Sequence, residues 1–298
     1  MVTALPLSHD SEERHARPWW LLPLTGLSLV AFAGNSVLCR MALGEGAIDW
    51  ASFSLIRMLS GALTLMLAFA ILGGKGRVVH QGSWRAAGWL TTYAVTFSYA
   101  YLTLGAGTGA LILFGTVQLT MIGYGVLRGE RPSGLEWTGF LIAAAGLVYL
   151  VLPGVQSPDV IGALLMAIAG LGWGAYSLLG KGSTHAAWDT MGNLLRTSLL
   201  LLPFFLLMLP RAQISSWGIV LALSSGILAT GIGYWVWYAV LPLLSAMRAG
   251  ILQLAVPVIA AVGGGLLLGE RIDLRMILAS ATILGGVALA LLNRPVRG

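Results

Sequence analysis

Long apolar runs, separated by short polar or glycine-rich segments, dominate the pattern of hydrophobic and polar positions along this chain. A run of about 20 apolar residues is long enough to cross a bilayer as a helix. The pattern therefore predicts ten membrane-spanning helices. We expect them over residues 19–42, 50–72, 84–104, 107–127, 134–152, 160–180, 187–209, 216–239, 246–268 and 273–292.

The composition supports the same class. Of the 298 residues, 57% are hydrophobic and only 9% are charged, with a mean hydropathy of +0.86. A soluble domain carries about 25% charged residues. We predict an all-α polytopic membrane protein. The net charge of +6 then reflects basic loops rather than a nucleic-acid partner, and the single cysteine, Cys39, leaves no intrachain disulfide.

A short motif occurs twice at a fixed distance. Gly129-Glu130-Arg131 returns as Gly269-Glu270-Arg271, 140 residues later, and each copy ends a long apolar run. The same offset pairs Gly34 with Gly174, and Arg57 and Arg196 match at an offset of 139. One offset over most of the length indicates a tandem duplication.

The predicted domains follow from this duplication. Residues 1–18 form a tail, residues 19–152 the first five-helix repeat, and residues 159–292 the second. Because five is odd, the second repeat enters the membrane from the opposite side. The two halves are then inverted repeats, related by a pseudo-two-fold axis in the membrane plane.

The N-terminal region has an alternative interpretation as a cleavable signal peptide. Arg14 and Arg17 precede an apolar run that contains Ala31-Phe32-Ala33. However, the run continues to Leu43, broken only by Arg40, and the repeat gives it a later partner. We expect it to be retained as the first membrane helix.

Basic loop residues predict the orientation. With the N-terminus inside, eleven basic residues fall on the inner side and four on the outer side. Because short cytoplasmic loops carry the excess of Lys and Arg, we expect both termini in the cytoplasm. The predicted location is the cell (inner) membrane, with multiple passes.

Polar and aromatic residues recur at helical spacing in several predicted spans. In span 84–104, Thr92, Thr96, Tyr99 and Thr103 share one face. Similar faces in other spans contribute further candidates, since polar groups are costly against lipid. The candidate substrate-binding residues from these faces are Asn35, Tyr99, Trp173, Tyr176, Tyr234 and Trp237. The alternative for each hydroxyl is ordinary hydrogen bonding between helices.

Trp173 is the first candidate because it lies well inside its span, whereas most of the other Trp residues fall near span ends. Gly170, Gly172 and Gly174 flank it. Its ring could stack on an aromatic substrate. The alternative is tight helix packing through Gly170-x-x-x-Gly174.

Charged residues inside the spans are few. No acidic residue and no histidine lies in the middle of a predicted span, which argues against a proton relay, a metal site, a cofactor and an intramembrane enzyme. Lys181 could meet a substrate carboxylate or snorkel to the interface. We expect Arg57 and Arg196 to hydrogen-bond helix carbonyls and to be structural.

The C-terminal half carries a family resemblance. Tyr234-Trp235-Val236-Trp237-Tyr238-Ala239-Val240 leads into Ser245-Ala246-Met247-Arg248-Ala249-Gly250, and Pro257 precedes the second Gly-Glu-Arg motif. This resembles the EamA-type, ten-helix branch of the drug/metabolite transporter superfamily, and most of all the YddG-type aromatic amino-acid exporters. The resemblance implies alternating access around a central cavity, with spans 134–152 and 273–292 at the periphery.

The predicted function is therefore export of amino acids, including aromatic ones, by alternating access, as a facilitator. The expected partners are amino-acid substrates and the lipid bilayer. A drug or other metabolite exporter on the same fold is the alternative. An intramembrane enzyme would need a catalytic constellation that the sequence does not offer.

Overall fold

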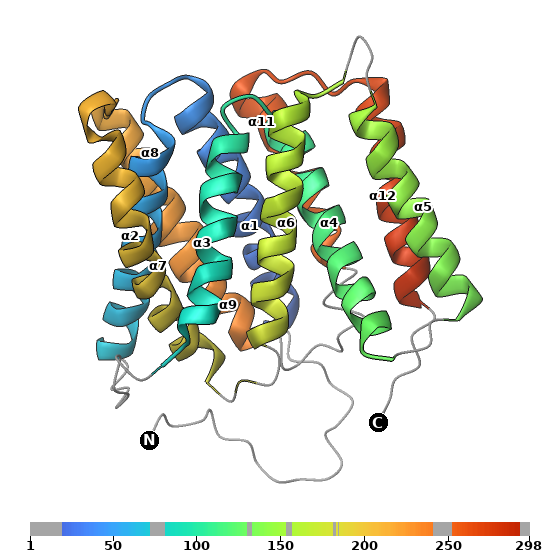
Figure 1. Cartoon of the computed structure of the whole chain (residues 1–298), viewed down its shortest axis with the longest axis horizontal. Coiled ribbons are helices and arrows are strands. Elements are labelled where there is room, and N and C mark those ends of the chain that lie inside the picture. Colours follow the sequence, from blue (N-terminus) through green and yellow to red (C-terminus); the bar gives the residue numbers. More distant parts are fainter. Residues whose placement is uncertain are drawn as a thin grey trace, which may run out of the picture.

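The computed structural model describes residues 20–71, 81–129, 133–152, 157–180, 183, 185–240 and 252–292. Over these residues the chain forms helices that pack side by side as a bundle (Figure 1). The helices are α1 (Leu21–Gly44), α2 (Trp50–Ile71), α3 (Trp84–Ala100), α4 (Ala106–Leu127), α5 (Gly134–Val151), α6 (Val160–Gly180), α7 (Ala186–Met208), η2 (Leu209–Arg211), α8 (Ser216–Ser224), η3 (Ser225–Ile232), α9 (Gly233–Val240), α11 (Ala255–Leu268) and α12 (Leu274–Leu292).

Within the described residues, seven helical stretches are long and apolar enough to cross a membrane, and α11 and the stretch Leu274–Ala290 are shorter apolar helices. The chain is an all-helical, multi-pass membrane protein, as its hydrophobic pattern predicts. The predicted tail at 1–18 and most of the joint at 153–159 lie outside the described residues.

Three predicted spans differ from the observed helices. The span predicted at 246–268 starts outside the described residues, and α11 begins at Ala255. The span predicted at 84–104 ends at Ala100, because the chain turns there and buries Tyr101, whose hydroxyl donates to the Ala106 carbonyl at 3.3 Å. The span predicted at 216–239 is divided into α8, the π-helical η3 and α9. At η3 the helix approaches α2 closely, since a Cβ on Gly226 would lie 2.5 Å from the Arg57 carbonyl oxygen.

The helices pack in a small number of pairs. α2 packs against α7, α3 against α6, and α4 against both α6 and α11. α1 packs against α11, α9 and η3, which brings it to the interior of the bundle. α5 and α12 pair with each other at one edge of the bundle (Figure 1), which is where the family resemblance places them.

Small residues let α5 and α12 approach closely. A Cβ on Gly139 would lie 2.5 Å from the Gly286 carbonyl oxygen, and one on Gly286 would lie 2.6 Å from the Ala143 amide nitrogen. Such small residues are typical of helix contacts in membranes. This pair is a packing unit that leaves the interior to the other helices.

The bundle has two ends, which we name by α1. The end where α1 begins, and where α12 also ends, is the proximal end; the end where α1 finishes is the distal end (Figure 1).

Both glycines of the repeated motif adopt a left-handed backbone next to a helix terminus. Gly129 (φ 86°) follows α4 and Gly269 (φ 64°) follows α11, a conformation that favours glycine. Glu130 and Arg131 lie outside the described residues.

A polar network joins three elements at the distal end. Arg40 of α1 forms an ion pair with Glu270, with Nε 3.3 Å from Oε1. The same carboxylate accepts hydrogen bonds from the Ala106 amide at 2.8 and 3.1 Å, which caps α4. Arg40 Nη1 also donates to the carbonyls of Tyr101 and Leu102, each at 3.1 Å. Residues from α1, the α3–α4 turn and the α11–α12 loop are thereby fastened together.

At the proximal end, α7 holds the loop that precedes α3. The Gly82 and Ser83 amides donate to the side chains of Asp189 and Asn193, each at 2.8 Å. Arg196 Nη1 donates to the Gln81 carbonyl at 2.5 Å and to the Gly192 carbonyl at 3.0 Å. The prediction that Arg196 bonds helix carbonyls is confirmed for the Gly192 carbonyl, whereas the Gln81 carbonyl belongs to the loop before α3.

Candidate functional site

Aromatic rings from three helices meet in the interior around Trp173 of α6. The Trp173 ring centroid lies 5.0 Å from that of Tyr93 (α3), 5.5 Å from Tyr176 (α6) and 5.3 Å from Tyr234 (α9). These separations are in the range of favourable aromatic pairs. Trp173 is partly accessible, whereas Tyr93, Tyr176 and Tyr234 are buried.

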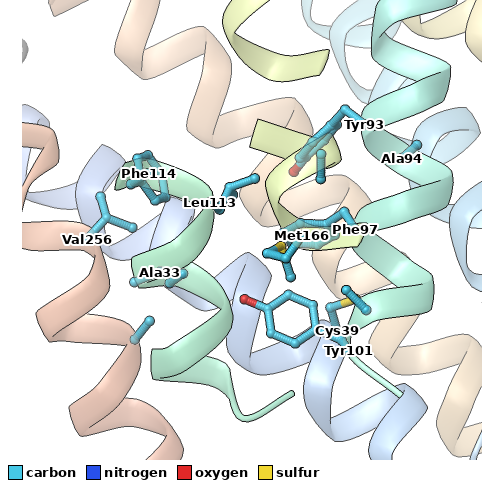
Figure 2. Packing of buried hydrophobic residues seen from close by; sticks show 14 of the residues in the cluster. Ala33, Cys39, Tyr93, Ala94, Phe97, Tyr101, Leu113, Phe114, Met166 and Val256 are labelled. Atoms are coloured by element: carbon cyan, nitrogen blue, oxygen red, sulfur yellow. The ribbon is translucent and has the colours of Figure 1, made fainter. Parts of the chain in front are cut away.

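The aromatic group extends in two directions. Toward α1, the ring of Phe32 lies 5.8 Å from Tyr234 and 5.7 Å from Trp237, both in edge-to-face geometry. Along α3, Phe97 lies 5.0 Å from Tyr93. Figure 2 shows Tyr93 and Phe97 among the buried residues that pack between neighbouring helices. We call this group, together with the two polar residues described next, the aromatic site.

Asn35 of α1 supplies the first polar group of the site. Its amide nitrogen donates to the Tyr93 hydroxyl at 3.3 Å. Its amide oxygen accepts from the Ser225 hydroxyl at 2.7 Å and from Arg57 Nη1 at 3.2 Å. One side chain thus links α1, α2, α3 and η3.

Arg57 of α2 supplies the second polar group. Its side chain is fully buried, and its guanidinium carbon lies 5.0, 5.3 and 6.0 Å from the ring centroids of Phe97, Tyr93 and Phe53. These are cation–π distances. Nη1 is bonded to Asn35, but Nε and Nη2 are buried without a hydrogen-bond partner. Among the described residues no acidic side chain pairs with Arg57, so it brings a positive charge without a counter-ion to the aromatic site.

The π-helical segment η3 begins at this site. Ser225, its first residue, makes the hydrogen bond to Asn35. Single π-helical turns inside α-helices occur frequently at functional positions. Here the altered turn coincides with the Ser225–Asn35–Arg57 chain of hydrogen bonds.

The structure brings five of the predicted site residues together and places Tyr99 apart from them. Asn35, Trp173, Tyr176, Tyr234 and Trp237 all belong to the aromatic site or contact it. Tyr99 lies apart: its side chain is 45% exposed, and its ring contacts Trp50 at 5.8 Å. Lys181 lies outside the described residues.

On the polar face proposed for α3, the hydroxyls of Thr92 and Thr96 bond carbonyls of their own helix, and Thr103 also donates to Asp159. Thr92 donates to the Gly88 carbonyl at 3.1 Å and Thr96 to the Thr92 carbonyl at 2.8 Å. A threonine that bonds the carbonyl four residues earlier needs no other polar partner. The face of α3 that enters the site carries Tyr93 and Phe97 instead.

The packing interpretation of the glycines around Trp173 holds for Gly170 and Gly174, whereas stacking of Trp173 on a substrate stays a prediction. A Cβ on Gly170 would lie 2.7 Å from Thr116 Cβ of α4, and one on Gly174 would lie 2.9 Å from Thr120 Cγ2. These glycines allow close packing of α6 on α4. Trp173 projects toward the aromatic rings of α3 and α9.

Sequence reasoning missed Phe32, Arg57 and Tyr93. The expectation that Arg57 bonds helix carbonyls is wrong for its side chain, which bonds the Asn35 amide instead. A signal was present in the sequence: an ionisable residue within a membrane helix is a functional candidate by default. The spacing of Leu90, Tyr93, Ala94 and Phe97 also marks one face of α3, which is buried in the structure.

The family follows from sequence comparison. The EamA-like transporter family model matches residues 160–292. An uncharacterised protein of Pseudomonas aeruginosa is 48% identical over 277 residues, covering 92% of this chain and 95% of its own length. The chain belongs to the EamA-like transporter family. This family is part of the drug/metabolite transporter superfamily, as the Gly-Glu-Arg motif and the residues before it suggested.

Two further relatives of this transporter are more distant. An uncharacterised transporter of Bacillus subtilis, YoaV, is 26% identical over 279 residues, covering 89% of this chain and 94% of its own. A protein of Escherichia coli named "probable amino-acid metabolite efflux pump" is 24% identical over 222 residues, covering 66% and 74%. A solved crystal structure with 21% identity matches with a TM-score of 0.64 over 92% of this chain and 98% of that one, which shows a shared fold.

Proposed function

We propose that this EamA-like transporter exports amino acids, aromatic ones among them, through the aromatic site. The observation that carries the proposal is the meeting of Trp173, Tyr93 and Tyr234 with the polar pair Asn35 and Arg57 inside the bundle. Rings offer a stacking surface to an aromatic substrate, and the polar pair offers hydrogen bonds to its charged end. The name of the E. coli relative agrees with this substrate class.

We further propose that residues 19–152 and 159–292 are inverted repeats of five helices each. The packing pairs support this arrangement. Under the 140-residue offset, α3 against α6 corresponds to α9 against α1, and α4 against α6 corresponds to α11 against α1. The left-handed backbone of both Gly129 and Gly269 agrees with it.

The proposed repeat and the basic loop residues together support one orientation of the chain across the membrane. The proximal end, the termini and the tail at 1–18 would face the cytoplasm in the inner membrane. Reporters fused after Arg77 should then read cytoplasmic, and reporters placed within 153–159 should read external. The opposite reading at both places would overturn this orientation.

Alternating access is the proposed mechanism. In the structure Arg40 and Glu270 fasten the distal end, so release to the outside requires that this network separate. The two side chains of this pair are only 25% and 21% exposed, and four further hydrogen bonds join them to the α3–α4 turn. Opening must therefore exchange these bonds for water or for other partners.

The proposed energetics is facilitated exchange down the substrate gradient. Among the described residues, the acidic side chains lie at helix ends or in loops: Glu45, Asp49, Glu136, Asp159, Asp189, Glu270 and Asp273. Intramembrane carboxylates commonly form proton relays. Uptake into liposomes should therefore proceed without an imposed proton gradient, and strict dependence on a pH gradient would contradict this mechanism.

The experiment that tests the function is uptake of labelled amino acids by purified protein in liposomes. We expect transport of phenylalanine and tryptophan, with counterflow when unlabelled substrate is loaded inside. Transport of unrelated drugs together with no amino-acid uptake would favour a drug exporter. The absence of any uptake would contradict the proposed function.

A further inference from the structure

We propose that the Arg57 guanidinium binds the carboxylate of the transported molecule. This inference rests on the proposed function in one respect, because it takes the aromatic site as the place where substrate binds. It adds that the substrate group recognised there is a carboxylate. Five observations about Arg57 and its neighbours support it.

The first observation is the geometry of the unpaired donors. Nη1 of Arg57 is bonded to Asn35, whereas Nε and Nη2 have no partner. Nε–H and the nearer Nη2–H lie in the guanidinium plane and project from the same edge of the group. This edge matches the two oxygens of a carboxylate, and such bidentate pairs are the strongest charge-assisted hydrogen bonds of arginine.

The second observation is the absence of a counter-charge. No ion pair joins Arg57 to an acidic side chain in the part of the chain that the structure describes. Burying a charge is costly unless it is paired. Since guanidinium does not lose its proton in proteins, the charge must be met by an anion when the site is loaded.

The third observation is that the guanidinium is held in place. Ser225 fixes the Asn35 amide, and Asn35 fixes Nη1 of Arg57. The rings of Phe53, Tyr93 and Phe97 lie around the guanidinium. A recognition group held by such neighbours loses little side-chain entropy when it binds.

The fourth observation is depth. Arg57 follows the first residue of α2 by seven positions, which is about 10 Å along the helix axis. A side chain so placed and fully buried does not reach the membrane interface. Snorkelling, the usual structural use of arginine in membranes, does not describe it.

The fifth observation is the neighbourhood of the bound group. Tyr93 is in contact with both the Arg57 guanidinium and the Trp173 ring, at 5.3 and 5.0 Å. A carboxylate on Arg57 would therefore lie beside Tyr93, one ring away from Trp173. The selected class is therefore a carboxylic acid with a compact apolar or aromatic body.

The test compares three carboxylic acids, each with the amide in which an uncharged carboxamide replaces the carboxylate. They are L-phenylalanine and L-phenylalaninamide, L-leucine and L-leucinamide, and 3-phenylpropionate and 3-phenylpropionamide. Binding is measured as the ligand-induced shift in melting temperature of the full-length purified protein, and as competition for uptake in liposomes. We expect at least one acid to bind about tenfold or more tightly than its amide.

The variants are Arg57→Met, Arg57→Lys and the matched control Arg196→Met. Arg57→Met should abolish the difference between acid and amide, and Arg57→Lys should keep part of it. Arg196→Met removes a guanidinium of the same chain at the corresponding repeat position, and it should leave the acid-to-amide ratio at the wild-type value. Circular dichroism and gel filtration verify that each variant is folded.

The outcomes separate the two proposals. Preference for 3-phenylpropionate over its amide, lost in Arg57→Met, with no amino acid bound would support the carboxylate site and contradict amino-acid export. Amino acids bound equally well as amides, or an acid preference that survives Arg57→Met, would overturn the carboxylate site alone. Chloride producing the same shift as the acids, or no acid binding at all, would also overturn it.

Discussion

Arg57 and Arg196 occupy matching positions in the two halves of the chain, yet they lie in opposite environments. Arg196 of α7 is partly accessible and bonds the carbonyls of Gln81 and Gly192 beside the ring of Trp84. Arg57 of α2 is fully buried, bonds one side-chain amide, and keeps two nitrogens without a partner. The same residue type, at positions 139 residues apart, fastens a loop in one half and carries a charge without a counter-ion among the described residues in the other.

The physical difference lies in what surrounds each guanidinium. At Arg196 the loop before α3 turns back over α7 and presents a backbone carbonyl. At Arg57 the neighbours are the aromatic rings of α2 and α3 and the Asn35 amide. A shared sequence offset therefore does not fix the environment of a residue, since that depends on which partners surround it.

The largest effect on transport should come from placing a negatively charged side chain beside Arg57. Asn35→Asp puts a carboxylate at the amide oxygen that lies 3.2 Å from Arg57 Nη1. A buried pair at this separation attracts strongly, so it would occupy the guanidinium in place of substrate. We expect transport of carboxylates to fall by about tenfold or more, with a raised melting temperature, measured in liposomes and in detergent.

Asn35→Ala is the matched control for this change. It removes the same acceptor without adding a charge, so Arg57 remains open to substrate. We expect a clearly smaller loss of transport and no rise in melting temperature. Wild-type transport by Asn35→Asp would show that Arg57 does not meet the substrate.

The second-largest effect is on stability, and it distinguishes Arg196 from Arg57. Arg196→Met loses hydrogen bonds from a charged donor to two carbonyls, which should cost about 1–3 kcal/mol. Arg57→Met removes a buried charge without a counter-ion, while Asn35 keeps its bond from Ser225. We expect its stability to equal or exceed that of the wild type, as read from thermal melting. A larger loss for Arg57→Met than for Arg196→Met would indicate a structural role for Arg57.

Most of the helices could be predicted from the sequence, because apolar runs of membrane length carry a strong signal. The predicted span 50–72 differs from α2 by one residue, and span 160–180 coincides with α6. The π-helical turn at η3 was not predictable, since it depends on the close approach of Gly226 to α2. That approach is a tertiary contact.

The candidate site was predicted in part, and the misses share a cause. Trp173 and Asn35 were found because an aromatic flanked by glycines and an amide stand out in an apolar helix. Tyr99 was selected because threonines at helical spacing suggested a polar face, and Tyr93 was not considered. Those hydroxyls bond carbonyls of their own helix, so the spacing carried no information about the interior.

The third effect concerns the rings that surround Arg57. Replacing Trp173 by Ala removes a stacking surface worth about 0.5–1.5 kcal/mol, or roughly a two- to tenfold change in affinity. The loss should be greater for phenylalanine than for leucine, because only the former stacks. Trp173→Phe should retain more activity than Trp173→Ala, measured as competition for uptake. Equal losses for both substrates with lower melting temperature would favour a packing role.

The smallest effect on uptake should come from replacing Tyr99. This replacement compares the exposed face of α3 with the buried face that carries Tyr93. Tyr99 is 45% exposed and contacts Trp50, whereas Tyr93 is buried between Arg57 and Trp173. Tyr99→Ala should change uptake of phenylalanine and leucine by less than about twofold and to the same extent, since a surface substitution usually costs less than about 0.5 kcal/mol.

Tyr93→Phe gives the internal comparison for Tyr99. It keeps the ring that Trp173 contacts but removes the hydroxyl to which Asn35 donates at 3.3 Å. Freed from that bond, Asn35 is less firmly held and positions Arg57 less well. Uptake of every carboxylate should therefore weaken by more than in Tyr99→Ala, with the preference for aromatic substrates preserved. If Tyr99→Ala instead reduced aromatic uptake selectively, substrate would contact the outer face of α3, and the pathway would not pass through the aromatic site.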